Sequence, residues 1–243
     1  MRSVMADVLS EQEARDAVKF RLIWKNPVDG GYHEVGQFEH LRDGRYVFAY
    51  REDVGSVDGF HPLLQFPDTG RPYVSEVLPA FFANRVMSRK RVNYGEYVGW
   101  LGLTEDALPV EILARTGGGR ETDTFHVVDS FEEHDGRCEG WFFISGVRHQ
   151  NEAVARELKV GDQLELCDEP DNPVNPRAIL LTTDGTPVGW VPDWLVDTVH
   201  RLRETNEVEV FVDQVNLDAP SRLAVLCRLE AGQLSTGREP SEM

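Results

Sequence analysis

Three prolines recur at every third position of one short segment, at Pro170, Pro173 and Pro176. Proline fixes φ and has no backbone N–H, so neither a helix nor a central β-strand runs through such a segment. Asparagine and aspartate, which fill most positions between the prolines, favour turns. Because an alternating segment at 163–167 and an apolar run at 178–181 flank it, we predict a stiff corner between two strands.

The corner has three roles that its residues leave open. Asn172 and Asn175 are candidates for holding a ligand, because a stiff turn loses little entropy on binding. The same side chains would otherwise only bond to the backbone of their own turn. Asp168, Glu169 and Asp171 are typical of a divalent-metal site in a hydrolase or nuclease. No lysine follows them at strand spacing, so an acid-rich turn without metal is favoured.

The charge of the chain limits the ligands that it attracts. Its 243 residues carry 25 Lys and Arg against 42 Asp and Glu, a net charge of −17. This argues against nucleic-acid binding through broad neutralisation of phosphates, but it allows a small local pocket. Cys138, Cys167 and Cys227 are far apart and lack a CxxC pair, so we expect no disulfide framework, metal or cofactor.

The sequence lacks the usual signals of a membrane span and of common catalytic motifs. No apolar run approaches the roughly 20 residues of a bilayer span, and the first residues have no apolar signal segment. We therefore expect a cytoplasmic protein with no membrane contact. The glycines at 117–119 lack the spacing of a phosphate-binding loop, and Ser145 lacks the glycines of a nucleophile elbow. The sequence predicts no enzyme.

Hydrophobic periodicity divides the chain into two halves near Thr122. In the first half we expect strands at 19–26, 32–41 and 45–52, and helices at 76–91, 93–103 and 109–116. In the second half we expect strands at 140–148, 162–169, 177–183, 187–192, 207–215 and 221–229, and helices at 151–159 and 193–205.

These elements predict an α+β fold. Residues 17–123 are expected to form a small antiparallel sheet with helices. Residues 124–230 are expected to form a β-rich small barrel with two helices. The polar ends, 1–16 and 231–243, are predicted to be a flexible lead-in and a flexible tail.

Four motifs follow one another in the second half: GVR at 146–148, LKVGDQLEL at 158–166, EPDNPVNPRAI at 169–179 and GTPVGWVP at 185–192. Their order resembles the HIRAN domain, a small β-barrel module found alone in bacteria and fused to remodelling helicases in eukaryotes. The resemblance covers about residues 124–229, and the long third motif makes it specific. It implies a concave face that binds the end of a single-stranded DNA.

The resemblance also implies particular pocket residues. Arg148 matches the arginine of the first family motif, and Asn172 matches the asparagine of the turn. Asn175 stands where the family has an aspartate. Trp190 and His149 are candidates for stacking on a base, although a tryptophan in a strand is also typical of a core.

Other positions depart from the family pattern. His149, Gln150 and Val174 replace aromatic residues of the family, and Asp193 aligns with a lysine. Residues 124–231 hold 9 Lys and Arg against 21 Asp and Glu, a balance of −12. Because acidic surroundings repel phosphate, binding of a protein instead of DNA stays open for this half.

The first half contains VGQF at 35–38, YVFAY at 46–50, PLLQFP at 62–67 and FFAN at 81–84. Their order resembles the N-terminal subdomain of HipA-type serine/threonine kinases over about residues 18–125. No lysine, catalytic-loop or metal-aspartate motif of the kinase core follows. The resemblance therefore implies a surface for a protein partner without the enzyme.

The one basic cluster, NRVMSRKR at 84–91, supplies the candidates for that surface. Arg85 and Arg89 lie four apart, close to the helical stripe of Phe81. Their stems would otherwise pack on the helix while their charged ends reach water or pair with acids.

We expect a non-enzymatic, two-domain binding protein. Its second half would hold a nucleic-acid end at Arg148, Asn172 and Asn175, and its first half would bind a protein partner. The alternatives are a purely protein–protein adaptor and a metal-dependent hydrolase or nuclease that uses the acids at 168–171.

Overall fold

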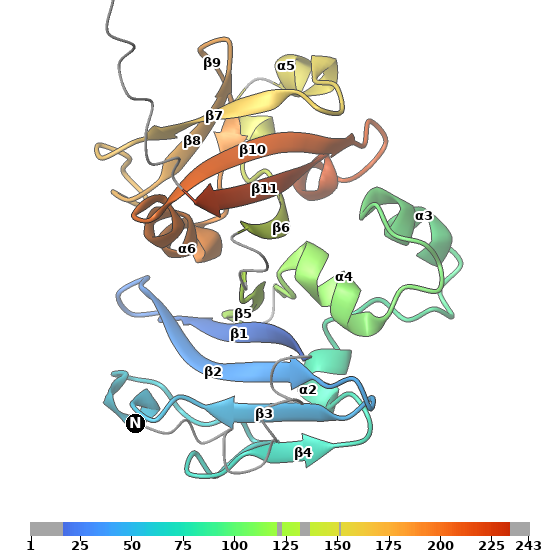
Figure 1. The fold of residues 1–243 in the computed structure, drawn as a ribbon, viewed down its shortest axis with the longest axis vertical. Helices are drawn as coiled ribbons and strands as arrows, with labels where there is room; N and C mark the ends of the chain where they lie inside the picture. Colours follow the sequence, from blue (N-terminus) through green and yellow to red (C-terminus); the bar gives the residue numbers. More distant parts are fainter. Residues whose placement is uncertain (1–16, 121–122, 132–136, 151, 234–243) are drawn as a thin grey trace, which may run out of the picture. The chain divides into compact units, whose positions relative to one another are not determined.

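The computed structural model describes residues 17–120, 123–131, 137–150 and 152–233 (Figure 1). The chain divides into two compact units, unit 1 from Met1 to Ser130 and unit 2 from Phe131 to Met243. Each unit contains an antiparallel sheet with helices, which confirms the α+β class (Figure 1). In these ranges no helix is both long enough and apolar enough to cross a membrane.

Unit 1 has a five-stranded antiparallel sheet in the order β4-β3-β2-β1-β5. The strands are β1 (Val18–Lys25), β2 (Tyr32–His40), β3 (Tyr46–Tyr50), β4 (Tyr73–Ser75) and β5 (Phe125–Asp129). A 3-10 turn, η2 (Val54–Ser56), follows β3. Between β4 and β5 lie the helices α2 (Ala80–Ala83), α3 (Tyr94–Trp100) and α4 (Pro109–Thr116).

The core of unit 1 is aromatic. The rings of Phe38 and Phe82 stack with their centroids 3.9 Å apart, and Phe48 lies 4.5 Å from Phe66. Phe38 and Phe48 lie opposite each other on β2 and β3, so the antiparallel register brings both to the face that α2 covers. Burying such large rings is the main source of stability for a sheet of this size.

Unit 1 extends beyond the boundary expected near Thr122. Strand β5 pairs with β1 from Phe20↔Asp129 to Trp24↔Phe125, so its residues belong to the first sheet. The units divide after Ser130 for this reason. No strand was expected at Phe125–Asp129, because a short segment of this kind becomes a strand only through its pairing with β1, and a local pattern does not show that pairing.

The helix expected over 76–91 is wrong for most of its length. Only Ala80–Ala83 is helical, and Phe82 from this turn enters the core. The chain then turns, because the next charged side chain, Arg85, points inward. Its side chain is 1% exposed in its ion pair with Asp123.

Arg85 is a buried structural cation. Its guanidinium donates to the Gly118 carbonyl at 2.8 Å, to the Phe125 carbonyl at 3.3 Å and to Asp123 Oδ2 at 2.7 Å. It also lies 4.2 Å from the centre of the Phe81 ring. Burial lowers the pKa of Arg85, and the Asp123 carboxylate partly offsets this. Arg85 is therefore not part of the partner surface expected for it.

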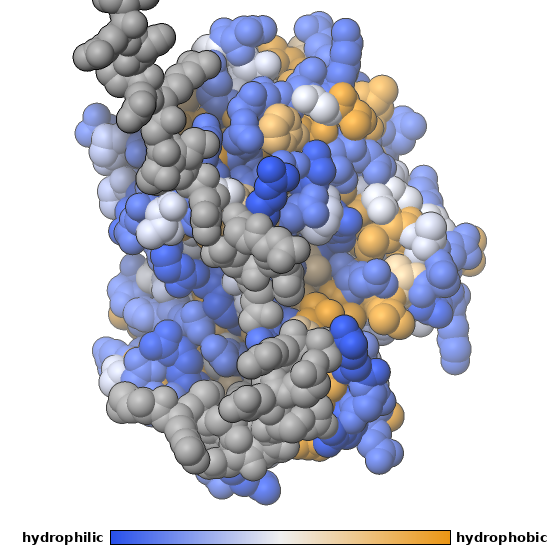
Figure 2. Space-filling model, in the orientation of Figure 1, coloured by the Kyte–Doolittle hydropathy of each residue, from blue (hydrophilic) through white to orange (hydrophobic). Residues whose placement is uncertain are grey.

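Unit 2 has a six-stranded sheet in the order β6-β11-β10-β7-β8-β9. The strands are β6 (Arg137–Phe143), β7 (Gln163–Asp168), β8 (Ile179–Thr183), β9 (Thr186–Trp190), β10 (Asn206–Val215) and β11 (Val225–Gln233). The helices are η3 (Val147–His149), α5 (Glu152–Glu157), α6 (Asp193–Arg203) and η4 (Ser221–Leu223). Hydrophilic side chains cover most of the face of unit 2 drawn in Figure 2.

The closed barrel expected for this half is not confirmed. The two edge strands approach each other through one isolated bridge, Ser145 with Trp190, just beyond the end of β6. A closed barrel requires continuous pairing around the ring. Of the expected terminal segments, 1–16 and 234–243 lie outside the described residues, whereas 231–233 belong to β11.

We predict that Arg85→Ala lowers the free energy of unfolding by about 3 kcal/mol, because Asp123 and two buried carbonyls lose their donor. Urea unfolding followed by far-UV circular dichroism measures this change. Arg45→Ala is the control, since Arg45 pairs with Asp43 at the surface, and we expect no measurable change for it. Equal unfolding midpoints for the two variants would contradict the structural role of Arg85.

Candidate nucleic-acid interface

The proline-rich corner between β7 and β8 is held by the side chains of its own asparagines. Asn172 Oδ1 accepts hydrogen bonds from the backbone N–H of Val174 at 3.0 Å and of Asn175 at 3.1 Å. Asn175 Oδ1 accepts one from the N–H of Arg177 at 2.9 Å. The two carbonyl oxygens therefore stabilise the turn, as in the alternative that the sequence left open.

The amide NH2 groups of the same asparagines point to carboxylates. Asn172 Nδ2 donates to Glu169 Oε2 at 2.9 Å, and Asn175 Nδ2 donates to Asp193 Oδ1 at 3.0 Å. Each NH2 group has two hydrogens, so each asparagine keeps one N–H for a ligand. Asp193, at the position aligned with a family lysine, adds negative charge beside Asn175.

Glu169 joins the corner to β9. Its Oε2 accepts a hydrogen bond from the indole Nε1 of Trp190 at 2.6 Å in addition to that from Asn172. Bonds to an ionised carboxylate are shorter and stronger than bonds between neutral groups. The sequence marked Glu169 only as one of three acids. Its role depends on a residue 21 positions later, so no local pattern indicated it.

Trp190 also packs against the start of η3. Its backbone N–H and carbonyl bond to Ser145 at 2.9 and 2.8 Å. Gly146 has φ +71°, and a Cβ on it would lie 2.7 Å from the Cε3 and Cζ3 atoms of Trp190. Glycine at this position therefore lets the indole lie directly on the backbone. The half-buried indole is fixed on two sides, by Gly146 and by Glu169.

Arg148 and His149 lie in η3, next to this contact. Both are exposed, and Arg148 Nε donates to His149 Nε2 at 3.3 Å. Within the described part of the chain, Arg148 bonds to neither Asn172 nor Asn175. Hydrogen bonds thus connect three of the predicted pocket residues, Asn172, Asn175 and Trp190. Arg148 and His149, the other two, lie in the neighbouring short helix η3.

The acids at 168–171 do not converge. Asp168 Oδ1 pairs with Arg203 at 2.6 Å, whereas Glu169 accepts a hydrogen bond from Trp190. Asp171 is exposed. Among the residues that the structure describes, no three His, Cys, Asp or Glu side chains form a group that could hold a metal ion. The corner therefore presents polar side chains beside one aromatic ring, that of Trp190.

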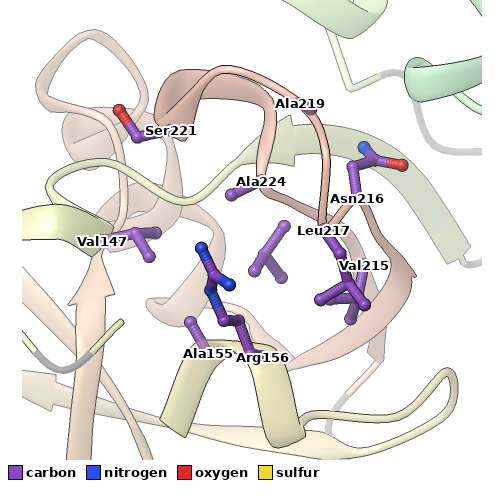
Figure 3. A pocket seen from close by; sticks show the side chains of 10 residues that line it. Val147, Ala155, Arg156, Val215, Asn216, Leu217, Ala219, Ser221 and Ala224 are labelled. Carbon is purple, nitrogen blue, oxygen red and sulfur yellow. The ribbon is translucent and has the colours of Figure 1, made fainter. Parts of the chain in front are cut away.

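A small hollow lies beside η3, where Val147 forms part of its wall. Its lining is mostly apolar and comes from η3, α5 and residues 215–225. Figure 3 shows the Arg156 side chain rising from α5 towards the turn at Ser221–Ala224. Asn216 holds this turn by donating to the Leu223 carbonyl at 2.7 Å. The hollow is therefore an apolar recess with a cation at its mouth.

One segment of unit 2 is similar to a known family. Residues 140–231 match the family model of the HIRAN domain, which confirms that resemblance for these residues. No curated protein matches the chain. The match does not reach residues 18–125 and lends no support to the HipA-like expectation.

Two solved structures are similar to part of the chain. The crystal structure of the HIRAN domain of human HLTF is 18% identical, with a TM-score of 0.29 over 40% of this chain and 77% of that chain. A protein from Lactobacillus plantarum is 16% identical, with a TM-score of 0.32 over 41% of this chain and 100% of that chain.

We predict that Gly146→Ala displaces the indole of Trp190, whereas Gly185→Ala does not. Gly185 has nearly the same backbone angle, φ +73°, but nothing lies within 4 Å of its added Cβ. Both variants are expected to lose about 1 kcal/mol of unfolding free energy from backbone strain. Gly146→Ala is expected to lose about 1–3 kcal/mol more from overpacking. Equal losses in urea unfolding would contradict this contact.

We predict that Glu169→Ala frees the indole of Trp190 and lowers the unfolding free energy by about 2 kcal/mol, since two charge-assisted hydrogen bonds are lost. Acrylamide quenching of tryptophan fluorescence is expected to increase. Asp171→Ala removes the same charge from the same turn, where no bond of its side chain is broken, and serves as the control. The prediction fails if both variants are quenched equally.

Proposed function

We propose that this protein is a binding protein without catalytic activity of its own, and that unit 2 recognises the end of a single-stranded DNA. The observation that supports this best is the match of residues 140–231 to the HIRAN domain, which is generally a single-stranded nucleic-acid binding domain. The bonded set of Trp190, Glu169 and Asn172 lies within the matched residues.

The groups of this set suit an unpaired nucleotide. The indole of Trp190 offers a face for one base, and such stacking contributes about 1–3 kcal/mol per base. The remaining N–H groups of Asn172 and Asn175 would donate to base or sugar oxygens. Arg148, exposed in η3, would contact a phosphate.

The carboxylates of the site restrict which end fits. Asp193 lies beside Asn175, and Glu169 lies beside Trp190. A free terminal hydroxyl donates a hydrogen bond to a carboxylate, whereas a terminal phosphate is repelled by it. We therefore propose a preference for an end that carries a hydroxyl group.

The competing function is a purely protein–protein adaptor. It is favoured by the net charge of −12 in residues 124–231, and by Asp193, which stands where the family has a lysine. The protein partner expected for residues 17–123 stays a prediction. Arg85 is buried and the Arg89 guanidinium bonds to backbone carbonyls, so neither offers a free guanidinium to a partner.

Fluorescence anisotropy at low salt tests the DNA proposal. Labelled single strands with a free 3′-hydroxyl, with a 3′-phosphate and with both ends paired are titrated with the protein. We expect the free hydroxyl end to bind best. Arg148→Ala is expected to weaken its binding roughly tenfold, because a charge-assisted hydrogen bond is lost. Arg201→Ala, an exposed arginine of α6, is the control and is expected to bind as the wild type does.

Two results would overturn the proposal. Equal and negligible binding of all three ligands would remove the DNA function and leave the adaptor. Cleavage of the strands with Mg²⁺ or Mn²⁺ that is lost in Asp168→Asn with Asp171→Asn would establish the hydrolase instead.

A further inference from the structure

The two carboxylates of the candidate site differ in their partners from several other acids of unit 2. Glu169 and Asp193 are half-buried, and among the described residues each accepts hydrogen bonds from amides or an indole and pairs with no cation. Acids elsewhere in the unit pair with arginines: Asp168 with Arg203, Asp197 with Arg177, and Glu139 and Glu230 with Arg228. The two carboxylates of the site are therefore open to donors from a ligand.

Asn175 and Asp193 form a pair that presents a donor next to an acceptor. Asn175 Nδ2 donates to Asp193 Oδ1 at 3.0 Å. An amide NH2 group has two hydrogens and a carboxylate has two oxygens, so the second N–H of Asn175 and Oδ2 of Asp193 are left without a partner in the described part of the chain. Hydroxyl groups, which both donate and accept, match such a pair.

The Asn175–Asp193 pair is fixed on both sides. In the proline-rich corner, the N–H of Asn175 bonds to Asn172 Oδ1 at 3.1 Å, and Asn175 Oδ1 accepts from the N–H of Arg177 at 2.9 Å. Asp193 is the first residue of α6, directly after Pro192. Because both side chains are held before a ligand arrives, little entropy is lost on binding.

The aromatic ring of the site is close to this pair. Trp190 precedes Asp193 by three residues, so their Cα atoms are at most about 11 Å apart. A second connection runs through hydrogen bonds, from the indole to Glu169, on to Asn172 and then to Asn175. A nucleotide whose base stacks on the indole would therefore bring its sugar to the Asn175–Asp193 pair.

The hydrogen-bond polarity at residue 193 is the reverse of that in the HIRAN pattern, where a lysine aligns with Asp193. A lysine only donates hydrogen bonds, whereas a carboxylate only accepts them. A ligand group that faces Asp193 must therefore be a donor. In the sugar–phosphate backbone of a nucleic acid the hydroxyl is such a donor, and an ionised phosphate is not.

We propose that the terminal nucleotide held by unit 2 is a ribonucleotide, and that Asp193 and Asn175 bind the vicinal 2′- and 3′-hydroxyls of its ribose. This inference rests on the proposed function and specifies the sugar of the last nucleotide. An ionised carboxylate accepts about four hydrogen bonds, of which Asp193 receives one from the chain. A deoxyribose end supplies one further donor, whereas a ribose end supplies two.

The second hydroxyl matters because the stacked nucleotide excludes water from the pair. A site that hydrogen-bonds a hydroxyl rejects an analogue without it, since the polar groups of the protein are then left unpaired. Carboxylates have this role towards the ribose 2′-hydroxyl in dinucleotide-binding folds. The 2′-hydroxyl is also the group by which proteins distinguish RNA from DNA.

Asp193 also has a structural role that the test must separate from binding. A carboxylate in the first turn of a helix is stabilised by the helix dipole, and this requires only its charge. Such a role predicts no difference between ribose and deoxyribose. The quantity to measure is therefore the ratio of the affinities for the two ends.

Fluorescence anisotropy compares single-stranded DNA oligonucleotides of one sequence that differ only at the last sugar: ribose, 2′-deoxyribose, 2′-O-methylribose, and 2′-deoxyribose with a 3′-phosphate. We expect the ribose end to bind roughly tenfold more tightly than the deoxyribose end, because one charge-assisted hydrogen bond is gained. The 2′-O-methyl end keeps the oxygen but has no hydrogen to donate. We expect it to bind no better than the deoxyribose end.

The variant is Asp193→Asn, which keeps an oxygen for Asn175 and replaces the free acceptor by a donor. Ribose and deoxyribose ends are expected to bind it equally. The matched control is Asp197→Asn on the next turn of α6, where the exposed carboxylate pairs with Arg177. It removes the same charge, so both ends are expected to bind slightly more tightly while their ratio stays about tenfold.

The outcomes separate this inference from the proposed function. Equal binding of ribose and deoxyribose ends by the wild type, with the 3′-phosphate still rejected, overturns the ribose inference alone. A ribose preference that persists in Asp193→Asn shows that Asp193 does not read the sugar. Competition by free adenosine at the concentrations of the ribose-ended strand would mean that the ligand is a nucleoside, and the inference is then wrong. If the wild type binds none of the strands, the inference and the proposed function fail together.

Discussion

The hydrogen bond from the Trp190 indole to Glu169 is the contact on which the candidate site depends. It joins the last residue of β9 to the corner after β7, and the same carboxylate oxygen accepts from Asn172. Close packing supports this contact. A Cβ on Gly189 would lie 2.5 Å from the Ser145 carbonyl, so glycine there lets the segment before η3 approach β9. Without the Glu169 contact, the asparagines would still form their turn, but no aromatic face would be fixed beside them.

Charge is distributed differently in the two units, and this bears on the ligand proposed for unit 2. In unit 2, carboxylates accept the side-chain hydrogen bonds of the site, so the site suits donors such as hydroxyl groups better than phosphates. In unit 1, Arg85 is buried with Asp123, whereas Lys90 and Arg91 face solvent.

Local patterns predicted an element well where residues next to one another in the sequence define it. The helix α4 spans Pro109–Thr116 as expected, because a proline at its first position and a glycine after its last define both ends. The proline-rich corner was also expected, because its prolines fix φ and its asparagines favour turns. The helix expected over 76–91 failed because the burial of Arg85 among distant carbonyls, 33 and 40 residues away, outweighed the apolar spacing of the segment.

The sequence alone determined most of the strands, though not β4 and β5, together with the stiff corner, the acidity and the resemblance of the second half to the HIRAN domain. All of these follow from neighbouring residues or from motif order. Tertiary structure decided that β5 pairs with β1, that the asparagine oxygens stabilise their own turn, and that Glu169 accepts a hydrogen bond from Trp190. It also decided which arginines are buried and which cations are left for a ligand. Hydrogen bonds and burial connect residues far apart in the chain, and no local pattern specifies those partners.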